Sequence, residues 1–462
     1  MPRHSARPVR PSPDRHATSR LPPGTNSWEA WPDYRSMLRS TGKTSLFMTI
    51  RADCPRPNLL RLANNNQEKK PMPGIAPVFV YPLLGADDTW SGFSIELSPG
   101  APDRQLLSQL LASPLLTTFD HRHPWFLPAL GGGYDAGVLT EQAVTVFPTH
   151  PDALDAEALT ELEASLRLAQ QKVALIASPD AKLPAAGCWD YLLISGSHAR
   201  SLPPFTLIGL ASRTKLVATE VHTHNDREWA LNNACTLSTG EFLLTRGAPN
   251  GKADITRLKL LKLLTLIADD ADTGALDTIF REESKLSYSL LRLVNSAALS
   301  PGSPITSFSQ AITLLGRRQL QRWLQLLVYS DPNNGHHPNP LLQKAAARGR
   351  LIELLAGHMT PPLPAEHVAD TAFMIGTFSL LDVLLGMSMP EILRQLPLPE
   401  IALKALIENK GGLGELVAVV TAVDKHDLKT ASAGLKALGI DGKVFFEAQL
   451  EAYGWASKLH PT

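Results

Sequence analysis

The sequence predicts a multidomain protein in which an α/β domain is followed by an all-α domain. Its 462 residues are too many for one ordinary core. Short apolar runs separated by loops fill 77–247, whereas from Ile255 onward apolar residues recur at helical spacing. Continuous apolar strands of the first kind are typical of a parallel sheet that is covered on both faces. We therefore expect two folded domains of different class.

The N-terminal segment differs from both. Residues 1–75 hold 13 Lys and Arg against 5 Asp and Glu, although the whole chain has 44 of each class. The segment is rich in proline and has little periodicity, which indicates a disordered basic Pro/Arg-rich tail over 1–75. It lacks the apolar core of a secretory signal. Whether these residues belong to the native protein, or precede a true start near Met48, is open.

The α/β domain is expected over 76–248. Its first strands are predicted at 77–84 ("PVFVYPLL") and 90–97 ("WSGFSIEL"), and a helix at 158–171. Four more strand-like runs follow, "KVALIAS", "WDYLLIS", "FTLIGLAS" and "TKLVATEV". Their alternation with loops predicts a parallel sheet.

The all-α domain is expected over 252–462. Leu286–Leu299 forms the first arm of a helical hairpin, and Ser307 with Gln310 makes a capping box that opens the second arm. Gly316 supplies a C-terminal stop. In the helix that follows, one face carries an apolar stripe of Leu320, Trp323, Leu324, Leu327 and Val328. Further helical segments continue to the end, so we expect a bundle with its own core.

Composition excludes several classes of protein. The three cysteines, Cys54, Cys188 and Cys235, are far apart and form no CxxC pair, which argues against a disulfide framework or zinc knuckle and fits a reducing compartment. No apolar run reaches the roughly 20 residues that a membrane helix needs. We expect a cytoplasmic protein without a membrane span.

Four segments of the helical half occur in an order that resembles the HDOD family of bacterial signalling domains. They are "YSLLRLVNSAA", "ITSFSQAITLLGRRQLQRWL", "AAARGRLIELLA" and "AFMIGTFSLLDVLLG". The resemblance covers about 200 residues and implies a relative of the HD phosphohydrolases that has lost the metal site. It implies regulation through a protein partner.

The chemistry of the residues agrees with a lost metal site. An HD hydrolase needs a histidine, an adjacent His-Asp pair and a further aspartate to hold a metal that activates water. The chain's His-Asp pair, His426-Asp427, has too little chain after it to complete a site, and the matching position reads Ser379-Leu380. Asp382 is the sole acid nearby.

The α/β half resembles a degenerate EAL domain, the fold that hydrolyses cyclic di-GMP. In the segments "WSGFSIEL", "KVALIASPD", "WDYLLIS" and "LVATEVHT", the family's opening Glu falls on Ser94 and its catalytic Lys on Leu193. The paired Asp residues and the two later Glu residues fall on Ile176, Ala177, Thr219 and His222. Glu96 or Glu220 could be displaced originals, but two carboxylates cannot bridge the two metals that phosphodiester hydrolysis uses.

The expected fold class is thus a reduced EAL-like, TIM-barrel-related α/β domain followed by an all-helical HDOD bundle. The α/β segment is shorter than the roughly 250 residues of a full eight-stranded barrel. We therefore expect a reduced or partly open barrel.

Eight polar residues of the bundle are candidates for interaction. Asn295 and Ser296 could contact a partner or satisfy backbone groups at a helix end. Arg317, Arg318 and Arg322 resemble the basic face of a DNA-reading helix, but the acidic body of the chain argues against specific nucleic-acid binding.

The other three candidates share one helix. Arg348, Arg350 and Glu353 are predicted to form a polar cluster that positions elements of the bundle. Their spacing makes an intrahelical pair between Arg350 and Glu353 equally plausible.

The sequence thus predicts a non-catalytic signalling scaffold, with no catalytic residues, metal ligands or cofactor, that acts through protein partners. A cyclic di-GMP sensor with weak nucleotide binding and a residual phosphodiesterase are the alternatives. The partner's identity and the oligomeric state are left open.

Overall fold

The computed structural model of the chain describes residues 75–98, 104–130, 135–148, 164, 172–180, 182–187, 189–246, 284–295, 304–329, 339–363, 368–394 and 396–459. Nearly all of the predicted tail and of the helix expected at 158–171 lie outside these residues. Ser296 lies outside them as well, and so does the beginning of the helical half.

Eight strands close into a barrel in sequence order. The strands are β1 Val78–Gly85, β2 Trp90–Leu97, β3 Trp125–Pro128, β4 Ala143–Pro148, β5 Lys172–Ile176, β6 Tyr191–Ser195, β7 Lys215–Thr219 and β8 Cys235–Ser238. Neighbours from β2 to β8 run parallel, whereas β1 is antiparallel to both β2 and β8. The expectation of a partly open barrel is therefore wrong: all eight strands are present and the sheet is closed.

Among the described residues, the segments that connect the strands form only short helices. The described pieces are α1 Arg104–Leu111, η1 Pro114–Thr118, η2 Gly137–Leu139, α3 Gly196–Ser201, α4 Thr206–Ala211, α5 His224–Asn232 and η3 Glu241–Leu244. The run "FTLIGLAS", predicted as a strand, is helix α4. Leu207 and Leu210 are buried while Ile208 is 55% exposed, a three-residue spacing that fits one face of a helix.

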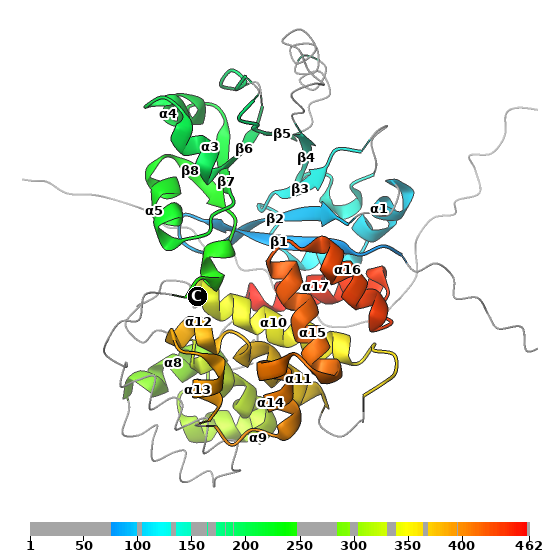
Figure 1. Cartoon of the computed structure of the whole chain (residues 1–462). Helices are drawn as coiled ribbons and strands as arrows, with labels where there is room; N and C mark the ends of the chain where they lie inside the picture. Colours follow the sequence, from blue (N-terminus) through cyan, green and yellow to red (C-terminus); the bar gives the residue numbers. More distant parts are fainter. Residues whose placement is uncertain are drawn as a thin grey trace, which may run out of the picture. The chain divides into compact units, whose positions relative to one another are not determined.

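Helices make up the described remainder of the chain (Figure 1). They are α8 Ser284–Val294, α9 Phe308–Leu327, α10 Pro340–Ala356, α11 Val368–Phe378, α12 Leu381–Leu385, α13 Met389–Leu393, α14 Glu400–Glu408, α15 Gly411–Asp424, α16 Leu428–Ala437 and α17 Gly442–Ala456. Ser307 caps α9, accepting a hydrogen bond from the Gln310 amide, but the predicted capping box is incomplete because the Gln310 side chain accepts from the Thr306 amide instead of the Ser307 amide. Gly316 interrupts α9 with φ 72°, and a second helical segment follows directly. The predicted apolar stripe of that segment is buried throughout.

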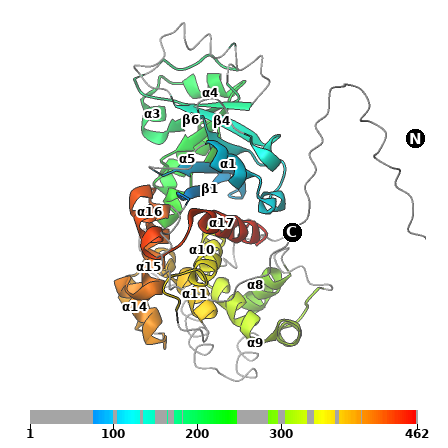
Figure 2. The ribbon, with the colours of Figure 1, turned by 90° about the vertical axis from the view of Figure 1, so that its right-hand side faces the viewer.

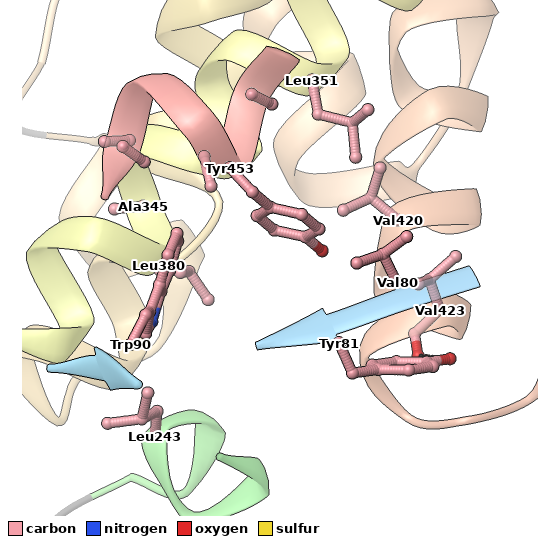
Figure 3. Close-up of a cluster of buried hydrophobic side chains, with 14 of the residues drawn as sticks. Val80, Tyr81, Trp90, Leu243, Ala345, Leu351, Leu380, Val420, Val423 and Tyr453 are labelled. Atoms are coloured by element: carbon pink, nitrogen blue, oxygen red, sulfur yellow. Dashed lines mark hydrogen bonds between the residues drawn. The ribbon is translucent and has the colours of Figure 1, made fainter. Parts of the chain in front are cut away.

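We expected the helical half to have a core of its own, but among the described residues its core is continuous with the apolar surface of the barrel. One apolar cluster runs from β1 and β2 into α10, α15 and α17 (Figures 2 and 3). Phe79 meets Phe445 edge-on at 5.5 Å between ring centroids, and Trp90 meets Tyr453 at the same separation. A separate cluster, which includes Leu83, fills the barrel interior.

Hydrogen bonds also join β1 to the helices. The buried side-chain amide of Gln449 on α17 donates to the Val78 carbonyl at 2.8 Å and accepts from the Val80 amide at 2.9 Å. The Tyr81 hydroxyl donates to the Val423 carbonyl at 3.1 Å. Strand β1 is therefore held by the barrel on one side and by the helices on the other.

One described stretch, Val368–Leu385, is apolar and long enough to cross a membrane by composition alone, with 44% of it buried in the protein. It comprises two helices, α11 and α12, and its residues Phe373, Ile375, Phe378 and Leu381 lie in the shared core.

Candidate binding site at the barrel mouth

A cavity of about 1020 Å³ opens at the ends of the barrel strands. In a barrel of this kind, residues that alternate along each strand point inward, and the carboxyl ends of the parallel strands form one face. The inward positions at these ends carry Pro128, Pro148, Ile176, Leu193 and Thr219, which all line the cavity. The floor is therefore largely apolar.

The positions matched to the EAL catalytic residues come together in this cavity. Ser94, Ile176, Leu193, Thr219 and His222 all line it, and Ala177, which directly follows β5, does not. Glu96 and Glu220, the two acids considered as displaced originals, line it too. The sequence register thus located the mouth correctly.

These residues do not fit a pair of divalent cations. Hard cations need several carboxylate or carbonyl oxygens, whereas the matched positions supply two hydroxyls, a histidine and aliphatic groups. Among the residues that the structure describes, no three His, Cys, Asp or Glu side chains are arranged to hold a metal ion. We derive no metal-dependent step for this mouth.

The loop between α15 and α16 places His426 in the barrel mouth. Its Nδ1 lies 3.0 and 3.1 Å from the two carboxylate oxygens of Glu96 on β2, and its Nε2 lies 3.4 Å from Glu241 on η3. The ring stacks on Tyr81 of β1, with centroids 4.1 Å apart and planes 19° from parallel. His426 has a left-handed backbone, with φ 56°. We call His426 with Glu96, Glu241 and Tyr81 the mouth latch.

The latch favours the charged imidazolium, since only that form donates from both ring nitrogens. Burial opposes protonation, but hydrogen bonds to Glu241 and Glu96 and their negative charges raise the pKa of His426 to about 9. Burial also acts to raise the pKa of Glu241, yet hydrogen bonds with His426 and Thr239 outweigh it and the pKa falls. The latch is a charged link between barrel and helices at neutral pH.

A buried ion cluster holds the end of α15, where this loop begins. Arg348 on α10 donates to Asp424 from Nε at 2.8 Å and from Nη2 at 2.6 Å, and Lys344 also pairs with Asp424. Burial acts to raise the pKa of Asp424, but the two cations outweigh it, so the carboxylate stays ionised. Arg348 also donates to the Ser379 hydroxyl at 2.8 Å. A cation of the protein itself thus lies beside the position matched to the lost HD pair.

A second polar cluster joins α9, α10, α11 and α17. Glu353 accepts from Arg322 at 2.6 Å and from Arg350 at 2.8 Å. Arg322 also bonds Asp370, and Arg350 bonds Glu451. Arg350 and Glu353 therefore pair along one helix and also contact neighbouring helices, but the predicted cluster of three is not formed, because Arg348 bonds Asp424 and Ser379 instead.

The other predicted interaction residues have different environments. Asn295 bridges the hairpin, donating to the Leu291 and Ile305 carbonyls and accepting from the Ile305 amide at 2.8 Å. It therefore has the structural role that was the alternative to partner contact. Arg318 pairs with Asp370. Arg317 lies in α9, and Ser296 falls outside the described residues.

Sequence reasoning missed the latch. His426 was considered only as part of an incomplete HD pair, and Tyr81 and Glu241 were not singled out. The partner Glu96 lies 330 residues earlier in the chain, so no local pattern links the two.

Comparison with known proteins identifies the helical region. Residues 257–376 match the HDOD domain family, so the chain contains an HDOD domain behind the eight-stranded barrel. The chain is 31% identical over 178 residues to the uncharacterized protein YuxH of Bacillus subtilis, covering 38% of this chain and 41% of YuxH. It is 27% identical over 258 residues to the cyclic di-GMP phosphodiesterase CdgJ of Vibrio cholerae, covering 54% and 57%.

The chain thus aligns with about half the length of these curated relatives. Among solved structures it is similar to the EAL-like domain protein YdiV, with 13% identity, a TM-score of 0.28, and coverage of 36% of this chain and 90% of that one.

Proposed function

We propose that this chain, which contains an HDOD domain, is a cytoplasmic signal-transduction protein that regulates by binding other proteins and does not hydrolyse cyclic di-GMP. The main support is the composition of the barrel mouth. The positions at which the resemblance to EAL domains would place metal ligands and a lysine are occupied by Ser94, Ile176, Leu193 and Thr219. Such a lining cannot hold the two cations that activate water for phosphodiester hydrolysis.

The helical half supports the same proposal. Ser379 and Leu380 replace the metal-binding pair, and the Arg348 guanidinium is hydrogen-bonded to Ser379. A fixed positive charge at that place opposes binding of a divalent cation. We retain 1–75, 76–248 and 252–462 as the proposed domain division.

The predicted interaction residues, however, do not identify the partner surface. Arg322, Arg348, Arg350 and Glu353 are all engaged inside the protein. Partner binding therefore rests on the HDOD resemblance, with a helical surface still to be found.

Two assays test the proposal. Purified protein incubated with cyclic di-GMP and Mg²⁺ or Mn²⁺ is expected to give no linear dinucleotide, with an active EAL enzyme as positive control. In affinity capture from native extract, the immobilised full chain and an immobilised Gly209→Ala control should retain the same protein. The control is conservative because a Cβ at Gly209 would have no other atom within 4 Å. Turnover above a buffer blank would refute the non-catalytic assignment.

A second candidate is favoured by the relative CdgJ, whose name is that of a cyclic di-GMP phosphodiesterase. Under it, the mouth still binds or slowly cleaves the dinucleotide. Calorimetry with cyclic di-GMP at micromolar concentration distinguishes the two, since heat of binding is expected only for the sensor.

A further inference from the structure

The barrel mouth holds a cationic side chain of the protein itself, the His426 imidazolium. Carboxylates from two elements, Glu96 and Glu241, converge on the planar His426 ring, and the aromatic face of Tyr81 covers it. Two carboxylates and a ring face are groups that attract an organic cation.

Beside this subsite the cavity is apolar and roomy. Its volume of about 1020 Å³ matches the upper range of small-molecule sites. Leu193 and Val217 lie along its wall, and Ile176 at the end of β5 is 42% exposed within it. An exposed isoleucine in a hollow offers apolar area to a ligand.

The charges of the lining disfavour a phosphodiester. The cationic His426 and Lys344 are already paired with carboxylates, which leaves Lys425 on the exposed rim. Among the carboxylates, Glu220 directly follows β7, is exposed and, within the described part of the chain, has no ion pair. The lining therefore presents more carboxylates than unpaired cations, and an anionic dinucleotide would be repelled.

We propose that the barrel mouth is a binding site for an apolar organic cation, which takes over the Glu96–Glu241 subsite from His426 and lays its apolar body on the Ile176–Leu193 wall. Binding would release the α15–α16 loop and so change the surface that the helical half presents. The inference concerns the barrel of the proposed signalling protein but does not depend on which partner it binds.

The test uses two probes of the same shape and opposite charge, tetraphenylphosphonium and tetraphenylborate, titrated into the full chain by calorimetry in a potassium-free buffer. The phosphonium should bind at least about tenfold more tightly, because its charge is opposite to that of the carboxylates whereas the borate has the same sign. Ile176→Arg should weaken phosphonium binding about tenfold by placing a like charge on the wall. Ile208→Arg, on an exposed isoleucine of α4 outside the cavity, should change it less than about twofold.

The variant His426→Gln provides an independent test. It removes the internal competitor and frees both carboxylates, so phosphonium binding at pH 7 should tighten about fivefold or more. Equal binding of both probes, or equal effects of the two arginine variants, would overturn the inference. Cyclic di-GMP turnover would overturn the proposed function alone, whereas partner capture without phosphonium binding would overturn this inference alone.

Discussion

The mouth latch predicts a specific dependence of stability on pH. Replacing His426 by Gln removes an imidazolium whose pKa is raised from 6.5 to about 9. A group with a raised pKa in the folded protein stabilises fully below its unfolded pKa and loses that effect as pH rises through the folded value. The contribution of His426 should therefore be complete at pH 6, decline between 6.5 and 9, and be absent at pH 10.

The size of the effect follows from the same shift. At about 1.4 kcal/mol per pKa unit, the latch is worth at most about 3.5 kcal/mol. The His426 side chain is 31% exposed, so solvent screening lowers this to about 1–2 kcal/mol. Glu96, Glu241 and Tyr81 face the ring directly, and the Asp424–Lys344 pair lies just behind.

Urea unfolding followed by tryptophan fluorescence measures the effect. The wild-type protein should exceed His426→Gln by about 1–2 kcal/mol at pH 6, and the difference should vanish at pH 10. His358→Gln, on an exposed histidine, should show no such pH-dependent gap. A difference between wild type and His426→Gln that is the same at both pH values would refute the charged latch.

Three further exchanges test the core below the latch. Asp424→Asn leaves the buried Arg348 and the partly buried Lys344 without a counter-ion and should cost about 3–5 kcal/mol by urea unfolding. Asp427→Asn, at an exposed helix cap that asparagine also satisfies, should cost almost nothing. Gln449→Ala strands two buried backbone groups of β1 and should lower stability by about 1–3 kcal/mol in the same assay. Gly376→Ala would bring its Cβ to 2.7 Å from backbone of α10 and should lower the melting temperature, while Gly209→Ala, which meets nothing within 4 Å, should hold or raise it.

Local patterns were enough to predict most elements. The strands at 78–85 and 90–97 and the buried apolar stripe of α9 follow from periodicities of two and 3.6 residues, because those periods decide which side chains share a face. The start of α9 follows from the residue type at its cap, Ser307. Strand β3, with four residues, is too short for a periodic signal, whereas β4 was missed although it is longer than the predicted strands β5, β6 and β7. The run that became α4 was misread because short apolar segments suit a strand and a helix alike.

The sequence by itself determined that this protein joins an α/β and an all-α part, and which side chains occupy the positions matched to two catalytic sites. Those facts depend on residue identity, which is local. The tertiary structure alone decided that the barrel closes, that both halves share one core, and that His426 lies between Glu96 and Glu241. Contacts between residues hundreds of positions apart depend on how packed surfaces meet, and no local pattern encodes that.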